Sequence, residues 1–301
     1  MRYKFDIVKN RNRYFMISII ITLIGILSLA IFGLNKGVDF KAGTTLDITV
    51  PGKTLEKIQV VKIINDSLTY QPSTTTIAED RASARFDKVL TMIQVNTVMD
   101  AFDKFYGVKV EHEESTVDTE LANELAIQAI VAVLIASLGI MLYIIIRFEW
   151  RFALSAVVGL FHDAFMVIAI FSIFRWEVNL PFVAAVLTII GYSINDKIVV
   201  FDRVRENLRF AKIKGYDDLS ELVNRSIWQT MSRNINTIMT VLIGAVCLFV
   251  FGSEGIRIFS LAMIVGLISG AYSSIFIASP LWLVMKNKSV TSARKVLAAK
   301  E

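Results

Sequence analysis

Six long apolar runs divide the sequence, and each is long enough to cross a lipid bilayer as a helix. A spanning helix needs about 20 predominantly apolar residues. Between the first and second runs the pattern changes to shorter segments that carry many charges. The pattern therefore predicts an all-α six-helix transmembrane bundle with one water-soluble domain between helices 1 and 2. The six runs are Tyr14–Leu34, Leu125–Ile146, Phe152–Phe174, Val178–Phe201, Asn234–Gly252 and Ile258–Met285.

The segment between the first two runs, residues 35–123, predicts an α+β domain. Its first part alternates apolar and polar side chains, as a half-buried strand does, until Pro51-Gly52 ends the alternation. Gly107 is a suitable C-cap for a preceding helix. The resulting β-α-β-β-α-β order is that of a ferredoxin-like split βαβ unit. The expected elements are Thr44–Val50, the helix Thr54–Leu68, Thr74–Ala78, Ala82–Asp87, the helix Val89–Tyr106 and Val108–Glu113.

Composition agrees with a membrane protein, because 54% of the residues are hydrophobic and the mean hydropathy is +0.58. The sequence has no cluster of His and Cys residues and no glycine-rich phosphate loop. We therefore expect no metal, no cofactor and no enzymatic activity. The single Cys247 cannot form an intrachain disulfide. The net charge is +5, but the basic residues flank the apolar runs, which indicates contact with membrane lipid and not with nucleic acid.

Lys and Arg residues are unevenly divided between the two sides of the predicted membrane. Five precede the first run, seven lie in the loop 202–233 and five follow Met285, whereas the opposite short loops hold only Arg175 and Arg257. The positive-inside rule therefore places both termini in the cytosol and the soluble domain outside. The expected parts are 1–34 with the cytosolic N-terminus and helix 1, 35–123 as the extracytoplasmic domain, 124–285 with helices 2–6 and the cytosolic loop 202–233, and 286–301 as a cytosolic tail.

One stretch of the cytosolic loop predicts a separate helix. Asp218-Leu219-Ser220-Glu221 resembles a capping box, in which side chains near a helix start satisfy its free backbone N–H groups. The apolar residues that follow share one face, so we expect this amphipathic helix to lie along the membrane interface.

A carboxylate lies within the fourth run, where hydrocarbon disfavours charge. Asp196 and its neighbour Lys197 are the only charged residues in Val178–Phe201. A charge inside the bilayer costs about 3 kcal/mol or more and usually faces a protein interior or an ion pathway, so Asp196 is a candidate proton-relay residue. Lys197 points to the opposite side of the helix, and we expect its stem to reach the cytosolic surface. The side that holds Asp196 also has Thr188, Tyr192, Asn195 and Val199.

The fifth run has a polar stripe of its own, with members spaced i, i+3, i+4, i+7 and i+11 on one helical face. Its first member, Arg233, is the natural counter-charge for Asp196, because a guanidinium stays charged at any accessible pH. If Asp196 gains and loses a proton, this pair would break and form. The alternative is a structural ion pair that holds the helices in register. The stripe consists of Arg233, Asn236, Thr237, Thr240 and Gly244.

Two other runs hold polar or small residues. The third has His162 and Asp163 on one face with Ser155 and Gly159. Asp163 lies at the midpoint of its run, so burial alone ranks it at least as high as Asp196 as a proton site. A structural role, in which the pair hydrogen-bonds a neighbouring backbone, is equally open. In the sixth run a small-residue seam favours close helix packing. It consists of Gly266, Ser269, Gly270, Ser273 and Ser274.

Several stretches resemble motifs of the SecF family, the smaller half of the SecD–SecF protein-export complex. The most specific is Gly191–Asn207, GYSINDKIVVFDRVREN, in the fourth run. The similarity extends over roughly residues 35–285, with departures at Lys197, where Ser or Thr is usual, and at Ala42, where Gly is common. The other matching stretches are Gly37–Thr44, Arg147–Arg151, His162-Asp163 and Ser232–Thr237.

The resemblance implies a half of the resistance-nodulation-division (RND) type in the bacterial cytoplasmic membrane, with SecD, the SecYEG channel and a translocating preprotein as partners. It implies that the proton (or sodium) motive force promotes preprotein export through Asp196 and Arg233. Residues that could extend the polar path are Tyr192, Asn195, Thr188, Asn236, Thr237, Thr240, His162 and Asp163.

Two other functions stay open. One is a half-transporter of an RND-type small-molecule or lipid exporter, which should have larger external domains with a ligand cleft. The other is a passive scaffold for the channel, which should tolerate neutral replacements of Asp196 and Arg233. The sequence leaves open whether the coupling ion is a proton or sodium, how Lys197 affects Asp196, and whether SecD is a separate chain or fused to this one.

Overall fold

The computed structural model describes residues 5–117, 119–213 and 215–287. The chain divides into two compact units. One, the α+β unit, comprises Lys36–Ile130, and the other, the helical unit, comprises Met1–Asn35 with Val131–Glu301. The tail expected at 286–301 lies almost entirely outside the described residues.

The α+β unit contains a four-stranded antiparallel sheet with the strand order β3-β4-β2-β5. Two helices connect the strands in the order β-α-β-β-α-β, so the ferredoxin-like arrangement is confirmed. The bounds are β2 Gly43–Thr49, α2 Lys57–Ser67, β3 Thr74–Ala78, β4 Arg81–Phe86, α3 Met92–Tyr106 and β5 Glu111–Val117.

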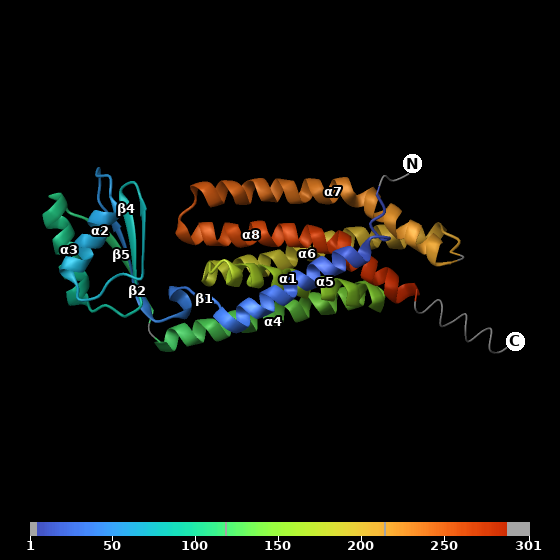
Figure 1. Ribbon diagram of the computed structural model, residues 1–301, viewed down its shortest axis with the longest axis horizontal. Coiled ribbons are helices and arrows are strands. Elements are labelled where there is room, and N and C mark those ends of the chain that lie inside the picture. Colours follow the sequence, from blue (N-terminus) through green and yellow to red (C-terminus); the bar gives the residue numbers. More distant parts are fainter. Residues whose placement is uncertain (1–4, 118, 214, 288–301) are drawn as a thin grey trace. The chain divides into compact units, whose positions relative to one another are not determined.

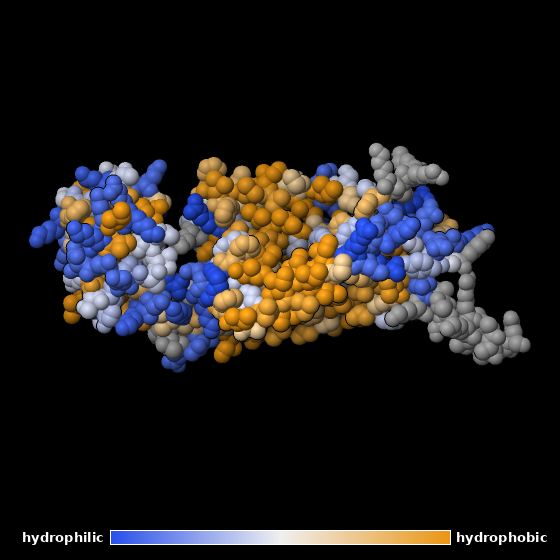
Figure 2. All heavy atoms as spheres, viewed as in Figure 1, coloured by the Kyte–Doolittle hydropathy of each residue, from blue (hydrophilic) through white to orange (hydrophobic). Residues whose placement is uncertain are grey.

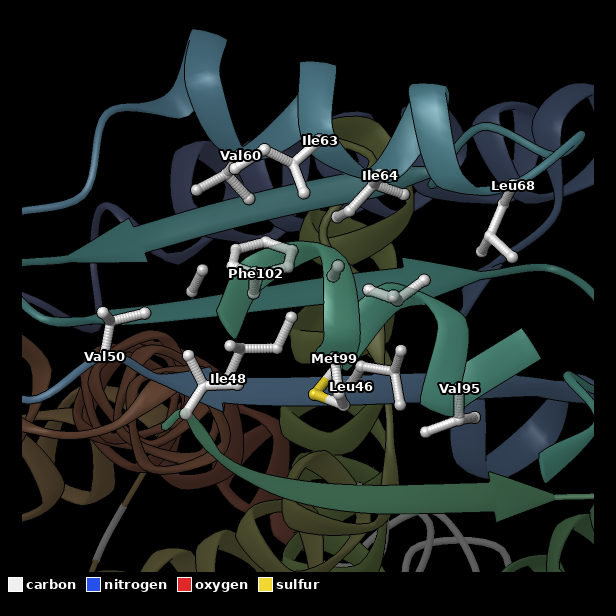
Figure 3. Packing of buried hydrophobic residues seen from close by; sticks show 14 of the residues in the cluster. Leu46, Ile48, Val50, Val60, Ile63, Ile64, Leu68, Val95, Met99 and Phe102 are labelled. Atoms are coloured by element: carbon white, nitrogen blue, oxygen red, sulfur yellow. The ribbon is translucent and has the colours of Figure 1, made fainter. Parts of the chain in front are cut away.

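Both helices bury their apolar faces against the sheet (Figure 3). Leu46, Ile48 and Val50 point inward from the β2 segment, as its alternation requires, and meet side chains such as Val60 and Phe102 from the helices. The capping box that opens α3 and the left-handed Gly107 that ends it (φ 69°) fix the length of that helix.

The last strand was predicted too early in the sequence. It runs over Glu111–Val117 instead of Val108–Glu113, and it pairs with β2 from Gly43↔Val117 to Thr49↔Glu111. β5 is an edge strand whose first six residues are all exposed. Without a buried face it has no apolar alternation, which is the signal that sets strand bounds in a sequence.

The helical unit confirms the six predicted spans, because the described residues hold six helices that are long and apolar enough to cross a membrane. The sixth continues from α8 through a π-helical turn at Ser274–Ala278 to residue 287. The bounds are α1 Arg11–Phe32, α4 Thr119–Arg147, α5 Trp150–Ile173, α6 Leu180–Phe210, α7 Tyr216–Phe251 and α8 Glu254–Ser273, with the short elements β1 Asn35–Lys36, η1 Val38–Phe40 and β6 Glu177–Val178.

Three helices, α5, α6 and α8, form the centre of the helical unit, and about half of each is buried. α1 packs on α5, while α7 packs on α6 and α8 and leaves most of its surface uncovered (Figure 1). Hydrophobic residues dominate the face of these helices seen in Figure 2, and hydrophilic residues gather where α6 joins α7. A hydrophobic surface of this kind is expected of a multi-pass membrane protein.

The prediction of a separate interfacial helix near Asp218 is wrong. Residues 216–251 form one continuous helix, α7, which begins in the loop and runs on through the fifth span. No Gly or Pro interrupts the sequence from 216 to 243, so nothing ends the helix before the membrane. The N-terminal segment packs beside it, with Ile7 N donating to Asn224 Oδ1 at 3.0 Å.

Candidate polar site within the helical unit

An ion pair lies in the interior of the helical unit, between α5 and α6. Lys197 Nζ is 2.7 Å from Asp163 Oδ2, and the two side chains are 0% and 1% exposed. A buried ion pair is stable only when the remaining polar atoms of both groups are also satisfied.

Hydroxyl groups from two helices satisfy them. Ser193 of α6 and Ser273 of α8 donate to Asp163 Oδ2 at 2.5 and 2.6 Å. The same two oxygens accept from Lys197 Nζ at 2.5 and 2.9 Å. The other carboxylate oxygen, Oδ1, accepts from Ser269 at 3.1 Å. We call Asp163, Lys197, Ser193, Ser269 and Ser273 the core cluster; it ties α5, α6 and α8 together.

His162 extends the core cluster to a fourth helix. Its Nδ1 is 3.1 Å from Asp163 Oδ1, and its Nε2 is 3.1 Å from Ser18 Oγ of α1. Tyr272 of α8 lies over the imidazole, with ring centroids 6.5 Å apart. The predicted face with His162 and Asp163 therefore exists, but its partners are side chains and not the backbone groups considered as an alternative.

The prediction that Lys197 extends to the cytosolic surface is wrong. Its side chain is fully buried because α5 and α8 supply a carboxylate and a hydroxyl within reach. The helical wheel gave its direction correctly, away from Asp196, but not which helices lie on that side. Two spacings could have revealed the cluster: Ser193 lies four residues before Lys197, and Ser269 lies four before Ser273.

Gly159 makes room for the lysine stem. A Cβ atom at this position would lie 2.4 Å from Lys197 Cε. Replacing Gly159 with Ala should therefore destabilise the protein by about 1–3 kcal/mol, the usual cost of overpacking. Chemical denaturation of the purified protein in detergent would measure this. Gly139→Ala on α4 is the matched control, because its Cβ meets nothing within 4 Å; equal effects at both positions would contradict the crowding argument.

Asp196 is in a different situation from Asp163. It is 7% exposed, yet among the described residues it makes no hydrogen bond or ion pair. Asp196 and Arg233 form no ion pair in this state of the described chain, in which Arg233 is exposed on α7, so their pairing stays a prediction. Helical periodicity placed each residue on the polar face of its own helix, but it could not show whether the two side chains meet.

The two predicted polar stripes lie on the surface of this chain. On α6, Thr188, Tyr192 and Asn195 line a shallow open depression together with Gly191. On α7, a Cβ atom at Gly244 would meet nothing, and Thr237 is only half-buried. The exposed members of the α7 stripe are Arg233, Asn236, Thr240 and Gly244. We call the α6 depression and the α7 stripe the polar face.

The polar side chains of the core cluster and of the polar face can form ion pairs and hydrogen bonds. Across the described ranges, no three or more His, Cys, Asp and Glu side chains come together as a metal site would require. Cys247 is a free, exposed thiol on α7. Asp163 is saturated by an ammonium and hydroxyl groups, whereas Asp196 makes no hydrogen bond or ion pair with a described residue, so the two carboxylates differ in their bonding.

Two family models match the sequence. One, described as "Protein export membrane protein SecD/SecF, C-terminal", matches residues 97–288, and the other, "SecD/SecF GG Motif", matches residues 27–50. A "Protein translocase subunit SecF" from Alicyclobacillus acidocaldarius is 41% identical over 98% of this chain and 97% of its own length. "Protein translocase subunit SecDF" from Bacillus subtilis is 42% identical over 95% of this chain, which spans 39% of that protein.

Solved structures agree with the sequence relatives. The crystal structure of SecDF from Thermus thermophilus, titled a translocon-associated membrane protein, matches 95% of this chain with a TM-score of 0.80 and 29% identity. A second, SecDF in a "Super-membrane-facing form", matches 98% with a TM-score of 0.69 and 26% identity. In both, this chain covers about two fifths of the longer chain, 39% and 40%. The chain belongs to the SecD/SecF family of protein-export membrane proteins, as a SecF member.

Proposed function

We propose that this chain is an accessory subunit of the Sec translocase that, with SecD, uses the proton motive force to promote preprotein export across the bacterial cytoplasmic membrane. In this proposal the polar face docks on SecD, Asp196 carries the proton, and Arg233 is its counter-charge in one of two states.

The observation that supports the proposal best is the exposure of the polar face. Polar side chains at membrane depth face a protein interior or a cavity, because hydrocarbon offers them no partners. Tyr192 and Asn195 on α6 and Asn236 on α7 are exposed and face no interior within the part of the chain that the structure describes. A second bundle of helices must therefore cover them.

The relatives indicate what that bundle is. The Bacillus subtilis relative is named SecDF, and this chain matches 39% of its length, so that protein carries additional chain. We infer that a SecD part, separate or fused, covers the polar face of this chain as well. The gap at Gly244 would let a SecD helix approach the α7 backbone closely.

The mechanism follows from the contrast between the two carboxylates. With Asp196 ionised, the Arg233 guanidinium attracts it across the space between α6 and α7; with Asp196 protonated, that attraction is lost. One charge that crosses 100 mV yields about 2.3 kcal/mol, enough to bias a two-state arrangement of helices. The core cluster keeps α5, α6 and α8 together meanwhile, so that movement is confined to the polar face.

The expected orientation of the chain in the membrane indicates which parts would contact the remaining partners. The excess of Lys and Arg in the N-terminal segment and in the 202–233 loop supports a cytosolic location for both and an external location for the α+β unit. The α+β unit would then contact the preprotein as it leaves the SecYEG channel, and the helical surface would contact lipid.

Asp196→Asn tests the proposal, because it removes the exchangeable charge and changes the side-chain volume little. In inverted vesicles that contain SecYEG and SecD, we expect the gradient-dependent part of preprotein translocation to be lost and basal translocation to persist. Asp217→Asn, at an exposed position on α7, is the matched control and should leave both unchanged. Full gradient stimulation in Asp196→Asn would contradict the proposal and favour a passive scaffold.

A further inference from the structure

Three oxygen atoms of the core cluster accept hydrogen bonds from the lysine ammonium. Asp163 Oδ2, Ser193 Oγ and Ser273 Oγ lie 2.7, 2.5 and 2.9 Å from Lys197 Nζ. They come from three different helices, α5, α6 and α8, whose packing holds them in place. We call these three oxygens the cage. Oxygen ligands held on rigid elements are how proteins bind hard, non-transition cations.

The charge of the cage corresponds to one monovalent cation. It contains one carboxylate and two hydroxyl groups, so its net charge is −1, and the ammonium of Lys197 brings the buried site to zero. A divalent ion would leave an uncompensated positive charge in a site whose two ionic side chains are 0% and 1% exposed, which is costly. The imidazole of His162 bonds the opposite carboxylate oxygen, Oδ1, and takes no place in the cage.

The lysine reaches the cage through space that other residues leave free. Its stem passes Gly159, where a Cβ atom would lie 2.4 Å from Lys197 Cε and 3.4 Å from Nζ. A shorter side chain at position 197 would therefore vacate two places: the point between the three cage oxygens where the ammonium lies, and the space beside Gly159 that the lysine stem fills. Asp163 would keep its hydroxyl donors and its charge.

We propose that the cage is a monovalent-cation site that Lys197 fills with a tethered ammonium. Residue 197 thus determines cation specificity: with Lys, the bundle core takes no free cation, and with a short neutral side chain it takes an alkali cation such as sodium. This inference goes beyond the proposed function and does not depend on it, since it concerns the binding of a cation between α5, α6 and α8 and not export.

The test is the thermal unfolding of the purified full-length protein in detergent, in NaCl and in choline chloride of equal ionic strength. Lys197→Ser should show a saturable rise in Tm in NaCl of roughly 5 °C or more over choline chloride, because a ligand that binds only the folded state stabilises it. The wild type should show no such difference between the two salts.

Two variants make the result specific to the cage. Lys197→Met fills the position without charge and should not respond to sodium. Asp163→Asn/Lys197→Ser has no carboxylate, should fold because both ionic partners are removed, and should not respond either. The proposal is overturned if Lys197→Ser responds no more than the wild type or the double variant, or if it does not fold in NaCl while the double variant does. Export is not measured, so neither outcome bears on the role of Asp196.

Discussion

Asp163→Asn should lower the free energy of unfolding by about 3–5 kcal/mol, the usual cost when one partner of a buried ion pair is removed. The variant leaves the Lys197 ammonium fully buried without a counter-charge, and it weakens the bonds from Ser193 and Ser273. Chemical denaturation of the purified protein, followed by the fluorescence of Trp282 and the other tryptophans of the helical unit, would measure the loss.

The second half of this experiment removes both charges. Asp163→Asn/Lys197→Met should be much closer to the wild type, because no charge is then left unpaired in the interior. Ser269→Ala, which deletes only the bond to Asp163 Oδ1, should cost about 1 kcal/mol. A double variant no more stable than Asp163→Asn would show that the ion pair is not what Asp163 contributes.

Phe102→Ala should destabilise the α+β unit by about 3–5 kcal/mol, as expected for a large aromatic side chain deleted from a packed core. Phe102 is 0% exposed, lies in the hydrophobic core of the α+β unit, and stacks on Tyr106 of the same helix with ring centroids 6.1 Å apart. Hydrogen exchange of the full-length protein, read by mass spectrometry over β2 to β5, would report the loss without disturbing the membrane helices.

Phe105, three residues later on α3, is the matched control for Phe102. It is 58% exposed, so Phe105→Ala should change the free energy of hydrogen exchange in the sheet by less than about 0.5 kcal/mol. Equal acceleration of exchange by the two variants would mean that the sheet is not stabilised by the core seen between α3 and the strands.

Much of the fold could be predicted from the sequence, because the signals were strong and local. Apolar runs longer than a bilayer needs identified all six spans, and alternation within Thr44–Val50 identified the central strand. The two errors share a cause. β5 has no buried face, and α7 has no Gly or Pro where it enters the membrane. The local sequence therefore shows neither where β5 begins and ends nor that α7 continues into the fifth span.

The sequence predicted which residues belong to the polar site, but not which of them bond to one another. The sequence identified Asp163, Asp196, His162 and Arg233 as polar groups at membrane depth. It sent Lys197 to the surface, whereas the fold joins Lys197 to Asp163. Its pairing of Asp196 with Arg233 stays a prediction. Helical periodicity gives the direction of a side chain within its own helix. Which helix lies in that direction depends on packing of the whole bundle.

The two buried carboxylates thus have complementary environments on one bundle. Asp163 is saturated by an ammonium and hydroxyl donors and links three helices, while Asp196, one residue from Lys197, makes no bond to any described group. A translocase subunit that moves needs both kinds: a fixed brace and a group whose charge can change. We propose that these roles belong to Asp163 and Asp196 respectively.

The assignment of these two roles is tested most directly by infrared difference spectroscopy of the protein in complex with SecD, recorded as the pH is lowered. Many carboxyl groups titrate together, so the spectrum of each variant is subtracted from that of the wild type. A protonated carboxyl band should remain when Asp196→Asn is subtracted, and none should remain when Asp163→Asn/Lys197→Met is subtracted. The opposite result, a band that remains only when Asp163→Asn/Lys197→Met is subtracted, would show that the proton is carried by the core cluster, and the proposed roles would be reversed.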